Sequence, residues 1–399
     1  MPTSQASFSL RKIAVPAFGP SLLYGMGNGA ILPVIALSAR ELGASIPASG
    51  LIAALVGIGS LISNIPASLL ASRYGERRAM MGAALFSMMA LALCALAPQA
   101  WLLALGVTMV GMAASVFLLA RQTYLTDAVP VSMRARAMST LGGTTRIGVF
   151  VGPFAGAAAI HFVGLSGAYW IALIAMMGAG IIAYAFPEMS TRPHPGTRAT
   201  PARSPQPGMT DILRTHRKAF MTLGAGVLLI SAMRASRQVV IPLWADHLGL
   251  EATAISLIYG LVAAVDMAVF YPAGRIMDLY GRLWIALPST LLMGISLMTI
   301  PFTTAPVAFV LVSLVLGFGN GIGSGIVMTL AADASPENGR TKFLGIWRLM
   351  SDLGSSGGPA LLAAVTALVS LAAGITVIGT LGLVAAAIFC RFLPARPAR

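Results

Sequence analysis

Long apolar runs, separated by short polar or basic segments, recur along the whole chain. A run of roughly 18 or more apolar residues is long enough to cross about 30 Å of hydrocarbon as a helix. The runs are continuous and do not alternate with polar residues, which indicates helices and not the strands of a barrel. The pattern predicts an all-α membrane protein with twelve spans, at about 13–38, 48–70, 79–97, 101–120, 137–160, 166–186, 219–245, 253–273, 283–302, 306–330, 343–368 and 370–393.

One stretch between the sixth and seventh spans differs from this pattern. Residues 187–218 are rich in Pro, Arg, Ser and Thr, which is typical of a linker, and their last part, "DILRTHRK", fits a short interfacial helix. We therefore expect an N-terminal six-helix bundle at 1–186, a cytoplasmic linker at 187–218 and a C-terminal six-helix bundle at 219–399.

The two halves repeat each other at a constant offset of 206 residues. The segment "PASLLASRYGER" (66–77) aligns with "PAGRIMDLYGRL" (272–283), and the same offset pairs "DAVP" (127–130) with "DASP" (333–336). Parallel six-span repeats related by an axis along the membrane normal are a transporter architecture, with the substrate site between the halves. We therefore expect two bundles related by a pseudo-twofold axis.

The composition agrees with a membrane protein, because only 10% of the residues are charged, against about 25% in soluble domains. The net charge is +14, and with a cytoplasmic N-terminus 21 of the 26 Lys and Arg fall on cytoplasmic segments, one (Arg40) falls outside and four fall within spans. This asymmetry follows the positive-inside rule, so the charge reflects topology and not nucleic-acid binding. We expect a multi-pass protein of a bacterial-type inner membrane with both termini in the cytoplasm.

Ionisable residues within the spans are the main candidates for function. A charge at the bilayer centre is costly unless it is paired or hydrated, so such residues usually face a bundle interior or a watery cavity. The alternative for each residue is a structural ion pair that holds helices together. The six residues are Arg146, Arg234, Arg237, Asp266, Arg348 and Asp352.

Depth along the helices sorts the possible partners. At 1.5 Å per residue, Arg146 lies about 14 Å and Asp266 about 11 Å from the cytoplasmic ends of their spans. The matched depth makes them possible partners, either directly or through a chain of water molecules. Arg348 and Asp352 lie four residues apart on one helix face and can neutralise each other. Asp266 is the first candidate for proton coupling, and Asp352 is the second.

Arg234 and Arg237 lie deeper, at about 22 and 27 Å, where the eighth span offers no acid at matching depth. Because a guanidinium can form two parallel hydrogen bonds with a carboxylate or phosphate, we expect both to line the outer part of a central cavity and to contact substrate. The alternative is that they only brace the seventh span against a neighbour. Four polar residues complete the expected cavity lining, namely Tyr24, Asn28, Gln238 and Asn320.

The repeated loop between the second and third span of each half resembles the G-x-x-x-D-R-x-G-R-R motif of the major facilitator superfamily. The second-half copy, "GRIMDLYGR", keeps Gly274, Asp278, Gly281 and Arg282. The first-half copy, "SLLASRYGERR", keeps Arg73, Gly75, Arg77 and Arg78, but has Ser72 in the place of the acid. The resemblance implies that these loops form charge contacts with neighbouring helix ends and latch one face of the protein. It also implies that the fifth and eighth spans face each other across the two halves, so we expect Arg146 and Asp266 to pair there or to share a chain of water molecules.

A second resemblance lies in the fifth span, where "GVFVGPFAGA" (148–157) is similar to the G-x-x-x-G-P-x-x-G-G signature of exporters in this superfamily. Residues Gly148, Gly152, Pro153 and Gly156 match it, and Ala157 occupies the last place. Small residues at four-residue spacing let helices approach closely, so the motif is also expected to pack helices. The resemblance implies the twelve-helix fold of the drug/proton antiporter-like members.

These observations predict a secondary transporter that works by alternating access, and proton-coupled efflux of small amphipathic or drug-like molecules is the leading interpretation. One alternative is an importer or exchanger of a small organic anion, and another is a membrane sensor or scaffold that does not transport. No metal motif, nucleophile elbow or Walker loop is present, so we expect neither an enzyme nor a cofactor. The expected partners are a small-molecule substrate, protons and the lipid bilayer, with the protein as a monomer.

Overall fold

The computed structural model describes residues 14–129, 134–185, 208–336 and 338–393. This part of the chain is helical, and no strand occurs in it. The helices are α1 (Ala14–Ile31), α2 (Ile35–Glu41), α3 (Ile46–Tyr74), α4 (Glu76–Ala95), α5 (Ala100–Ala128), α6 (Arg134–Val163), α7 (Ser166–Ala185), α8 (Met209–Thr215), α9 (Arg217–Ala219), the π-helical turn η2 (Phe220–Gly224), α10 (Ala225–His247), α11 (Ala252–Tyr280), α12 (Leu283–Thr299), the 3-10 turn η3 (Ile300–Phe302), α13 (Pro306–Gly323), α14 (Ile326–Ala334), α15 (Arg340–Leu368) and α16 (Leu371–Phe392).

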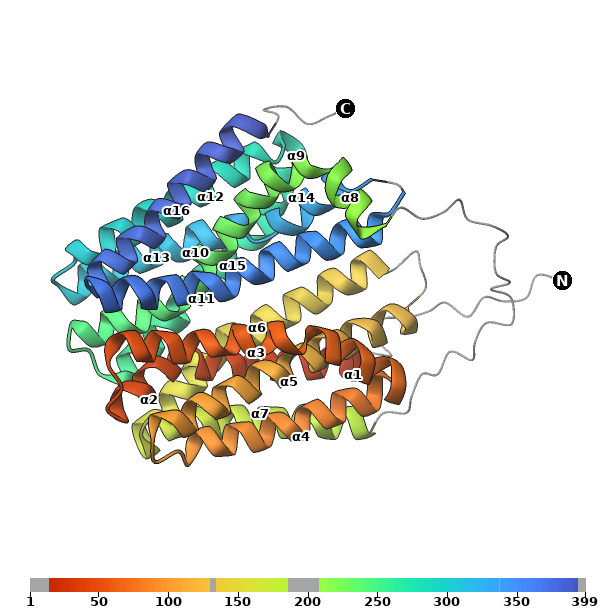
Figure 1. Cartoon of the computed structure of the whole chain (residues 1–399). Coiled ribbons are helices and arrows are strands. Elements are labelled where there is room, and N and C mark those ends of the chain that lie inside the picture. Colours follow the sequence, from red (N-terminus) through yellow and green to blue (C-terminus); the bar gives the residue numbers. More distant parts are fainter. Residues whose placement is uncertain (1–13, 130–133, 186–207, 337, 394–399) are drawn as a thin grey trace.

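The helices form two bundles that lie side by side (Figure 1). One contains α1–α7 and the other contains α9–α16, with the short α8 at one end of the second bundle. The packing repeats, because α1 packs on α6 as α10 packs on α15, and α4 packs on α7 as α12 packs on α16. We call the end of the molecule that carries α8 the α8 end, and the opposite end, which carries α2, the α2 end.

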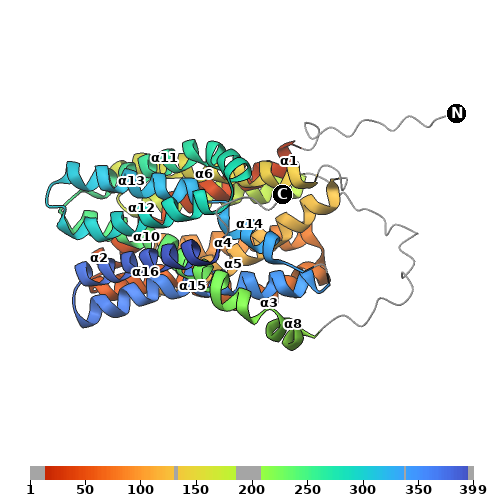
Figure 2. The same ribbon diagram turned by 90° about the horizontal axis from the view of Figure 1, so that it is seen from above.

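Two seams join the bundles. At one seam α6 packs against α11, and at the other α3 packs against α15. Seen from above, these two helix pairs lie on opposite sides of the molecule (Figure 2). Side chains of these four helices that face a seam therefore contact the other bundle.

Eleven helical segments of the described chain are long and apolar enough to cross a membrane. The twelfth spanning helix, α15, has 29 residues, but it carries Arg348, Asp352 and a run of Ser and Gly that makes it more polar than the others. The expected all-α architecture with twelve spanning helices in two bundles is confirmed. The first of these spans is interrupted at Pro33, between α1 and α2, because proline cannot donate to the helix and clashes with the preceding turn.

Glycine decides where helices touch most closely. In α6, a Cβ on Gly148 or Gly152 would collide with the backbone carbonyl of Leu22 or Met26 in α1. In α15, a Cβ on the equivalent Gly354 or Gly358 would collide with the carbonyls of two α10 residues, Leu228 and Ala232. These contacting pairs are related by the same offset of 206 residues, so the sequence repeat is also a repeat of helix packing.

The short connections of the repeated loops also depend on glycine. Gly75 joins α3 to α4 with a φ of 80°, and Gly281 joins α11 to α12 with a φ of 102°. Residues with a Cβ rarely adopt such a positive φ, so glycine at both positions allows the chain to turn directly from one spanning helix into the next.

Candidate functional site

The buried charges gather around one carboxylate near the middle of α11. Oδ1 of Asp266 lies 3.2 Å from Nη1 of Arg146 on α6, and this ion pair joins the two bundles. Oδ2 of Asp266 accepts a 2.5 Å hydrogen bond from the side-chain amide of Asn320 on α13 and lies 3.7 Å from Nη2 of Arg237 on α10. We call these four residues the Asp266 cluster.

The cluster is shielded from its surroundings to different degrees. The side chain of Arg146 is 30% exposed, against 14% for Asp266 and 11% for Arg237. The guanidinium of Arg146 also lies 4.2 Å from the centroid of the Phe270 ring on α11, a cation–π contact at the same seam. The expected pair of Arg146 and Asp266 across the bundles is thus present in the structure.

The expectation that Arg237 lacks an acid at matching depth was wrong. The eighth span was expected to end at residue 273, but α11 continues to Tyr280, which places Asp266 near the middle of the helix. Measured from the α2 end of each helix, Arg237 lies about 15 Å and Asp266 about 21 Å along the axis. The long arginine side chain covers the remaining distance.

Arg234 has no carboxylate within ion-pair distance among the described residues, and its buried Nε and Nη2 atoms lack a hydrogen-bond partner there. The guanidinium packs against the break between α13 and α14, where a Cβ on Gly323 would come within 2.7 Å of Nη2. It also lies within electrostatic reach of Asp266, Arg146 and Arg237. Three arginines therefore share one carboxylate, and the centre of the molecule carries excess positive charge.

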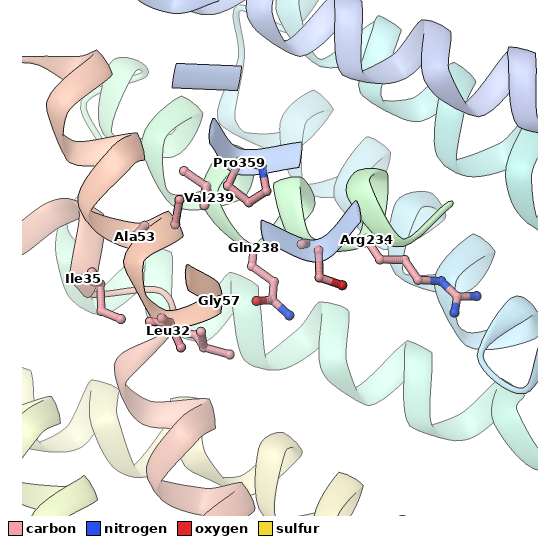
Figure 3. A pocket seen from close by; sticks show the side chains of 12 residues that line it. Leu32, Ile35, Ala53, Gly57, Arg234, Gln238, Val239 and Pro359 are labelled. Atoms are coloured by element: carbon pink, nitrogen blue, oxygen red, sulfur yellow. The ribbon is translucent and has the colours of Figure 1, made fainter. Parts of the chain in front are cut away.

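A cavity of about 230 Å³ lies between the bundles, where α10 and α15 meet α2 and α3. Arg234 and Gln238, both expected to line the substrate cavity, are among its lining residues, and most of the others are apolar. Figure 3 shows Gln238 between lining residues of the two bundles, while the side chain of Arg234 extends away from the other labelled residues. Two further expected lining residues, Arg237 and Asn320, are engaged by Asp266 instead.

Tyr24 and Asn28 do not line this cavity, contrary to expectation. They border a separate space of about 20 Å³ inside the N-terminal bundle, where the Asn28 amide donates a 3.2 Å hydrogen bond to the Tyr24 hydroxyl. The Tyr24 ring stacks on Phe117 of α5, with 5.3 Å between centroids. The guanidinium of Arg121, a buried arginine of α5, lies 5.8 Å from the centroid of the Tyr24 ring.

Arg121 is a buried charge that the sequence pattern assigned to a cytoplasmic segment. The fourth span was expected to end at residue 120, but α5 continues to Ala128 and Arg121 is only 7% exposed. Its Nη1 donates a 3.1 Å hydrogen bond to Oγ1 of Thr145, next to Arg146 on α6. The apolar run ends before Arg121, but the helix continues to Ala128. Only recognition that the polar residues after Arg121 are also helical could have predicted its burial.

The second seam carries its own polar network. Oδ2 of Asp352 on α15 accepts a 3.1 Å hydrogen bond from the Asn64 amide on α3, and Oδ1 of Asn64 accepts one of 2.9 Å from the hydroxyl of Ser115 on α5. Nε of Arg348 lies 3.8 Å from the same Asp352 oxygen, as the four-residue spacing led us to expect. Asp352 occupies the position in α15 that Arg146 occupies in α6, so the two seams carry opposite charges at equivalent positions.

An ion pair also joins the bundles at the α2 end. Nε of Arg40 on α2 lies 3.5 Å from Oδ2 of Asp246 on α10, and both side chains are 38% exposed. Beside this pair, Ala36 and Leu37 of α2 belong to the same buried apolar cluster as Val240 of α10. Apolar packing and an ion pair therefore close the α2 end between the bundles.

The repeated loop motif makes different contacts in each half. In the second half, Nε and Nη2 of Arg282 lie 2.7 and 3.3 Å from the two carboxylate oxygens of Asp333, at the end of α14. In the first half, Arg77 donates to the backbone carbonyls of Ala183 and Tyr184 at the end of α7. Arg77 thus binds carbonyls that lack helical partners at the end of a helix, whereas Arg282 binds an acidic side chain near the end of another.

The remaining motif residues contribute less. Arg73 lies 5.7 Å from the centroid of the Tyr74 ring, and Arg78 is exposed. A Cβ on Gly274 would meet nothing within 4 Å. The side chain of Asp278, the proposed acid of the second-half latch, lies outside the described part of the structure. In the fifth-span motif, Gly29 packs against Pro153, and Gly156 packs against Ala30.

Among the described residues, no group of three or more His, Cys, Asp or Glu could hold a metal ion. The site combines the carboxylates of Asp266 and Asp352 with several arginines, which can attract a negatively charged group.

Known proteins match this chain over most of its length. The family model for the Major Facilitator Superfamily matches residues 18–233 and 223–399. A multi-drug resistance efflux pump PmrA homolog from Lactococcus lactis subsp. lactis is 22% identical over 376 residues, which cover 93% of this chain and 87% of the pump.

Solved structures share the fold at low sequence identity. The D-xylose-proton symporter has a TM-score of 0.74 at 16% identity, over 96% of this chain and 98% of the symporter. A POT family transporter in complex with a thioalcohol-conjugated peptide has a TM-score of 0.79 at 14% identity, over 96% of both chains. The human organic anion transporter MFSD10 (TETRAN) has a TM-score of 0.66 at 15% identity, over 96% of this chain and all of that one (100%). The family model matches both halves of the chain, and the solved structures share its two six-helix bundles. The chain belongs to the Major Facilitator Superfamily of transporters, which are not enzymes.

Proposed function

We propose that this transporter exports small amphipathic or drug-like molecules in exchange for protons, and that Asp266 carries the proton. The observation that supports this is the place of Asp266 on the seam between the bundles. One carboxylate oxygen faces Arg146 of the other bundle, and the other oxygen faces Arg237 and Asn320 of its own bundle. Rocking of the bundles must change the first contact, so the ionisation of Asp266 is coupled to the state of the transporter.

The chemistry at this site is a proton equilibrium. A proton bound at Oδ1 of Asp266 makes the carboxylate neutral and ends its attraction to Arg146, so the seam can separate without an unpaired carboxylate in a low-dielectric region. Release of the proton restores the attraction to Arg146 and to Arg237 and favours the closed seam. Uptake on one side of the membrane and release on the other then accompany movement of substrate.

Two observations support export and an amphipathic substrate. The relative that is 22% identical is a multidrug efflux pump, and the fifth-span glycines match the exporter signature. The cavity between the bundles combines apolar walls with the polar side chains of Arg234 and Gln238, which suits a molecule with one apolar and one polar part.

We place the α8 end in the cytoplasm, because most basic residues lie there, and infer that this state is open toward that end. At the α2 end the bundles are closed by Arg40 and Asp246. At the α8 end, the loop arginines pair within their own bundles, Arg77 with α7 and Arg282 with α14. Substrate would therefore enter from the cytoplasmic side in this state, as export requires.

Transport by purified protein in liposomes with an imposed pH gradient tests the proposal. We expect wild-type protein to accumulate a fluorescent amphipathic dye against its gradient, and we expect Asp266→Asn to bind the dye but to lose gradient-driven accumulation. Glu251→Gln, which changes an exposed acid directly before α11, is the matched control and should retain it. If Asp266→Asn responds to the pH gradient as wild type does, Asp266 does not carry the proton.

A second candidate function is transport of a small organic anion, and the excess of three arginines over one carboxylate favours it. Charged hydrogen bonds contribute about 1.5–3 kcal/mol, so Arg234→Gln should weaken binding of a carboxylate substrate by about tenfold to a hundredfold. Binding can be followed by titration calorimetry with a panel of aromatic carboxylates, and Arg214→Gln on α8 is the control. Equal binding by the two variants would contradict a role for Arg234 in anion recognition.

A further inference from the structure

Two apolar cavities flank α4 on the outer side of the N-terminal bundle. One, of about 450 Å³, lies between α3 and α4 over α5, and its walls include Leu70, Phe86 and Met112. The other, of about 520 Å³, lies between α4 and α7, and its walls include Leu85 and Ile181. Both volumes fall within the range of about 300–1,000 Å³ that is usual for ligand pockets.

The helix packing explains the cavity between α3 and α4. Helices α3 and α4 both pack along α5 but touch each other little, which leaves a groove between them. Gly82 of α4 borders both cavities, and a Cβ at this position would meet nothing within 4 Å. At Gly82, no side chain of α4 therefore separates the two cavities. Leu85 and Ile181 are 59% and 58% exposed, so in a membrane these walls face hydrocarbon chains.

One end of both cavities is positively charged. Arg78 lines both of them and makes no ion pair among the described residues. The neighbouring loop holds Arg73 and Arg77 as well, and Glu76 is its single acid, because Ser72 replaces the acid of the loop motif. Arg77 donates to two carbonyls of α7, whereas Arg78 is exposed at the shared end of the two cavities and can bind a ligand there.

Aromatic residues mark the same end. Tyr74 lines the cavity between α3 and α4, and Tyr184 lines the cavity between α4 and α7. Tyrosine is enriched at the level of the lipid headgroups, and clustered basic residues there attract anionic lipids. The position of Arg78 is thus the depth at which a lipid phosphate lies.

We propose that one anionic phospholipid binds astride α4, with its two acyl chains in the two cavities and its phosphate on Arg78. A ligand with two apolar chains and one negative headgroup matches two apolar grooves that share a single cation. The second half has no equivalent, because Trp284 and Pro288 stand at the positions that correspond to Arg78 and Gly82. The site therefore belongs to the N-terminal bundle alone.

Native mass spectrometry of the full-length protein with added phosphatidylglycerol or phosphatidylcholine tests the proposal. We expect wild-type protein to retain one phosphatidylglycerol in preference to phosphatidylcholine. Loss of one interfacial arginine should weaken phosphatidylglycerol binding by about fivefold in Arg78→Gln and leave phosphatidylcholine unchanged. Gly82→Trp, which fills the grooves and keeps the charge, should weaken both lipids. Arg214→Gln removes an exposed cation at the same end and should match wild type.

Three results would overturn this site. They are equal retention of the two lipids by wild type, equal loss of phosphatidylglycerol in Arg78→Gln and Arg214→Gln, and displacement of the lipid by a transported dye in proportion to its transport affinity. Melting temperatures of all variants in detergent show whether each is folded. Since Arg78 is exposed and Gly82 faces open space, neither change removes a packing contact.

Discussion

Asp266 is held by groups from both bundles, and the three arginines around it depend on it unequally. Arg237 is the least exposed of the groups in ion-pair contact with it, and Arg146 has an aromatic ring as a second partner. Arg234 has no direct partner among the described residues. Removal of the shared carboxylate therefore leaves several buried cations without compensation, whereas removal of one arginine leaves the carboxylate with another.

This asymmetry predicts the order of two substitutions. Asp266→Ala should destabilise the protein by about 3–5 kcal/mol, because it strands buried cations, and Arg146→Ala should cost clearly less, because Arg237 still faces Asp266. The double variant should be more stable than the sum of the single effects indicates, since the two residues are in contact. Thermal unfolding in detergent measures all three. Additive effects, or a larger loss in Arg146→Ala, would contradict the geometry.

At the scale of elements, the closest contacts are between helices whose backbones meet without side chains. The α1–α6 pair and the equivalent α10–α15 pair both depend on glycines that face a backbone carbonyl. Other glycines of the same helices face open space, such as Gly142 in α6. A glycine in a spanning helix therefore either allows close helix packing or faces open space, and its contacts show which.

The two kinds of glycine should respond in opposite ways. Gly152→Ala forces its Cβ against the Met26 carbonyl and should lower stability by about 1–3 kcal/mol through overpacking. Gly142→Ala, ten residues earlier in α6, should leave stability unchanged or raise it by about 0.5–1 kcal/mol, because alanine favours a helix. Melting temperatures of the two variants provide the comparison. A tolerated Gly152→Ala would show that α1 and α6 do not pack this closely.

The whole molecule is closed between its bundles at the α2 end, with Arg40 and Asp246 as the ion pair across the closure. Because both side chains are partly exposed, the pair is expected to contribute only about 0.2–1 kcal/mol, and apolar packing of α2 against α10 provides the rest. Small changes here should shift the balance between states without unfolding either bundle.

Labelling of a buried cysteine can report that shift. In a background with Cys94→Ala and Cys390→Ser, Ala36→Cys should react slowly with a membrane-impermeant maleimide, because Ala36 is 1% exposed. Adding Arg40→Ala should speed the reaction by up to about fivefold, and high salt should produce a similar increase without that change. A labelling rate that neither change affects would mean that the ion pair does not hold the α2 end closed.

Much of the fold could be read from the pattern of apolar runs and from the repeat. The spans expected at 166–186 and 283–302 agree within one residue with α7 and with α12 followed by η3, because Gly, Pro or polar residues bound these apolar runs. The ends of α5 and α11 were misplaced, since both helices continue beyond the apolar run. Because of these extra turns, Arg121 is buried within a spanning helix, and Asp266 lies close enough to Arg237 to form an ion pair.

By itself, the sequence determined that the chain spans a membrane as two related sets of helices, and that Arg146 and Asp266 are at a common depth. Hydropathy and repeat spacing are local properties, so they can be read without coordinates. Only the tertiary structure decided which face of each helix meets the other bundle. It turned Tyr24 and Asn28 into the N-terminal bundle, joined Arg237 to Asp266, and brought Asn64 to Asp352. Such contacts depend on helix rotation and side-chain reach, which no spacing along a single chain specifies.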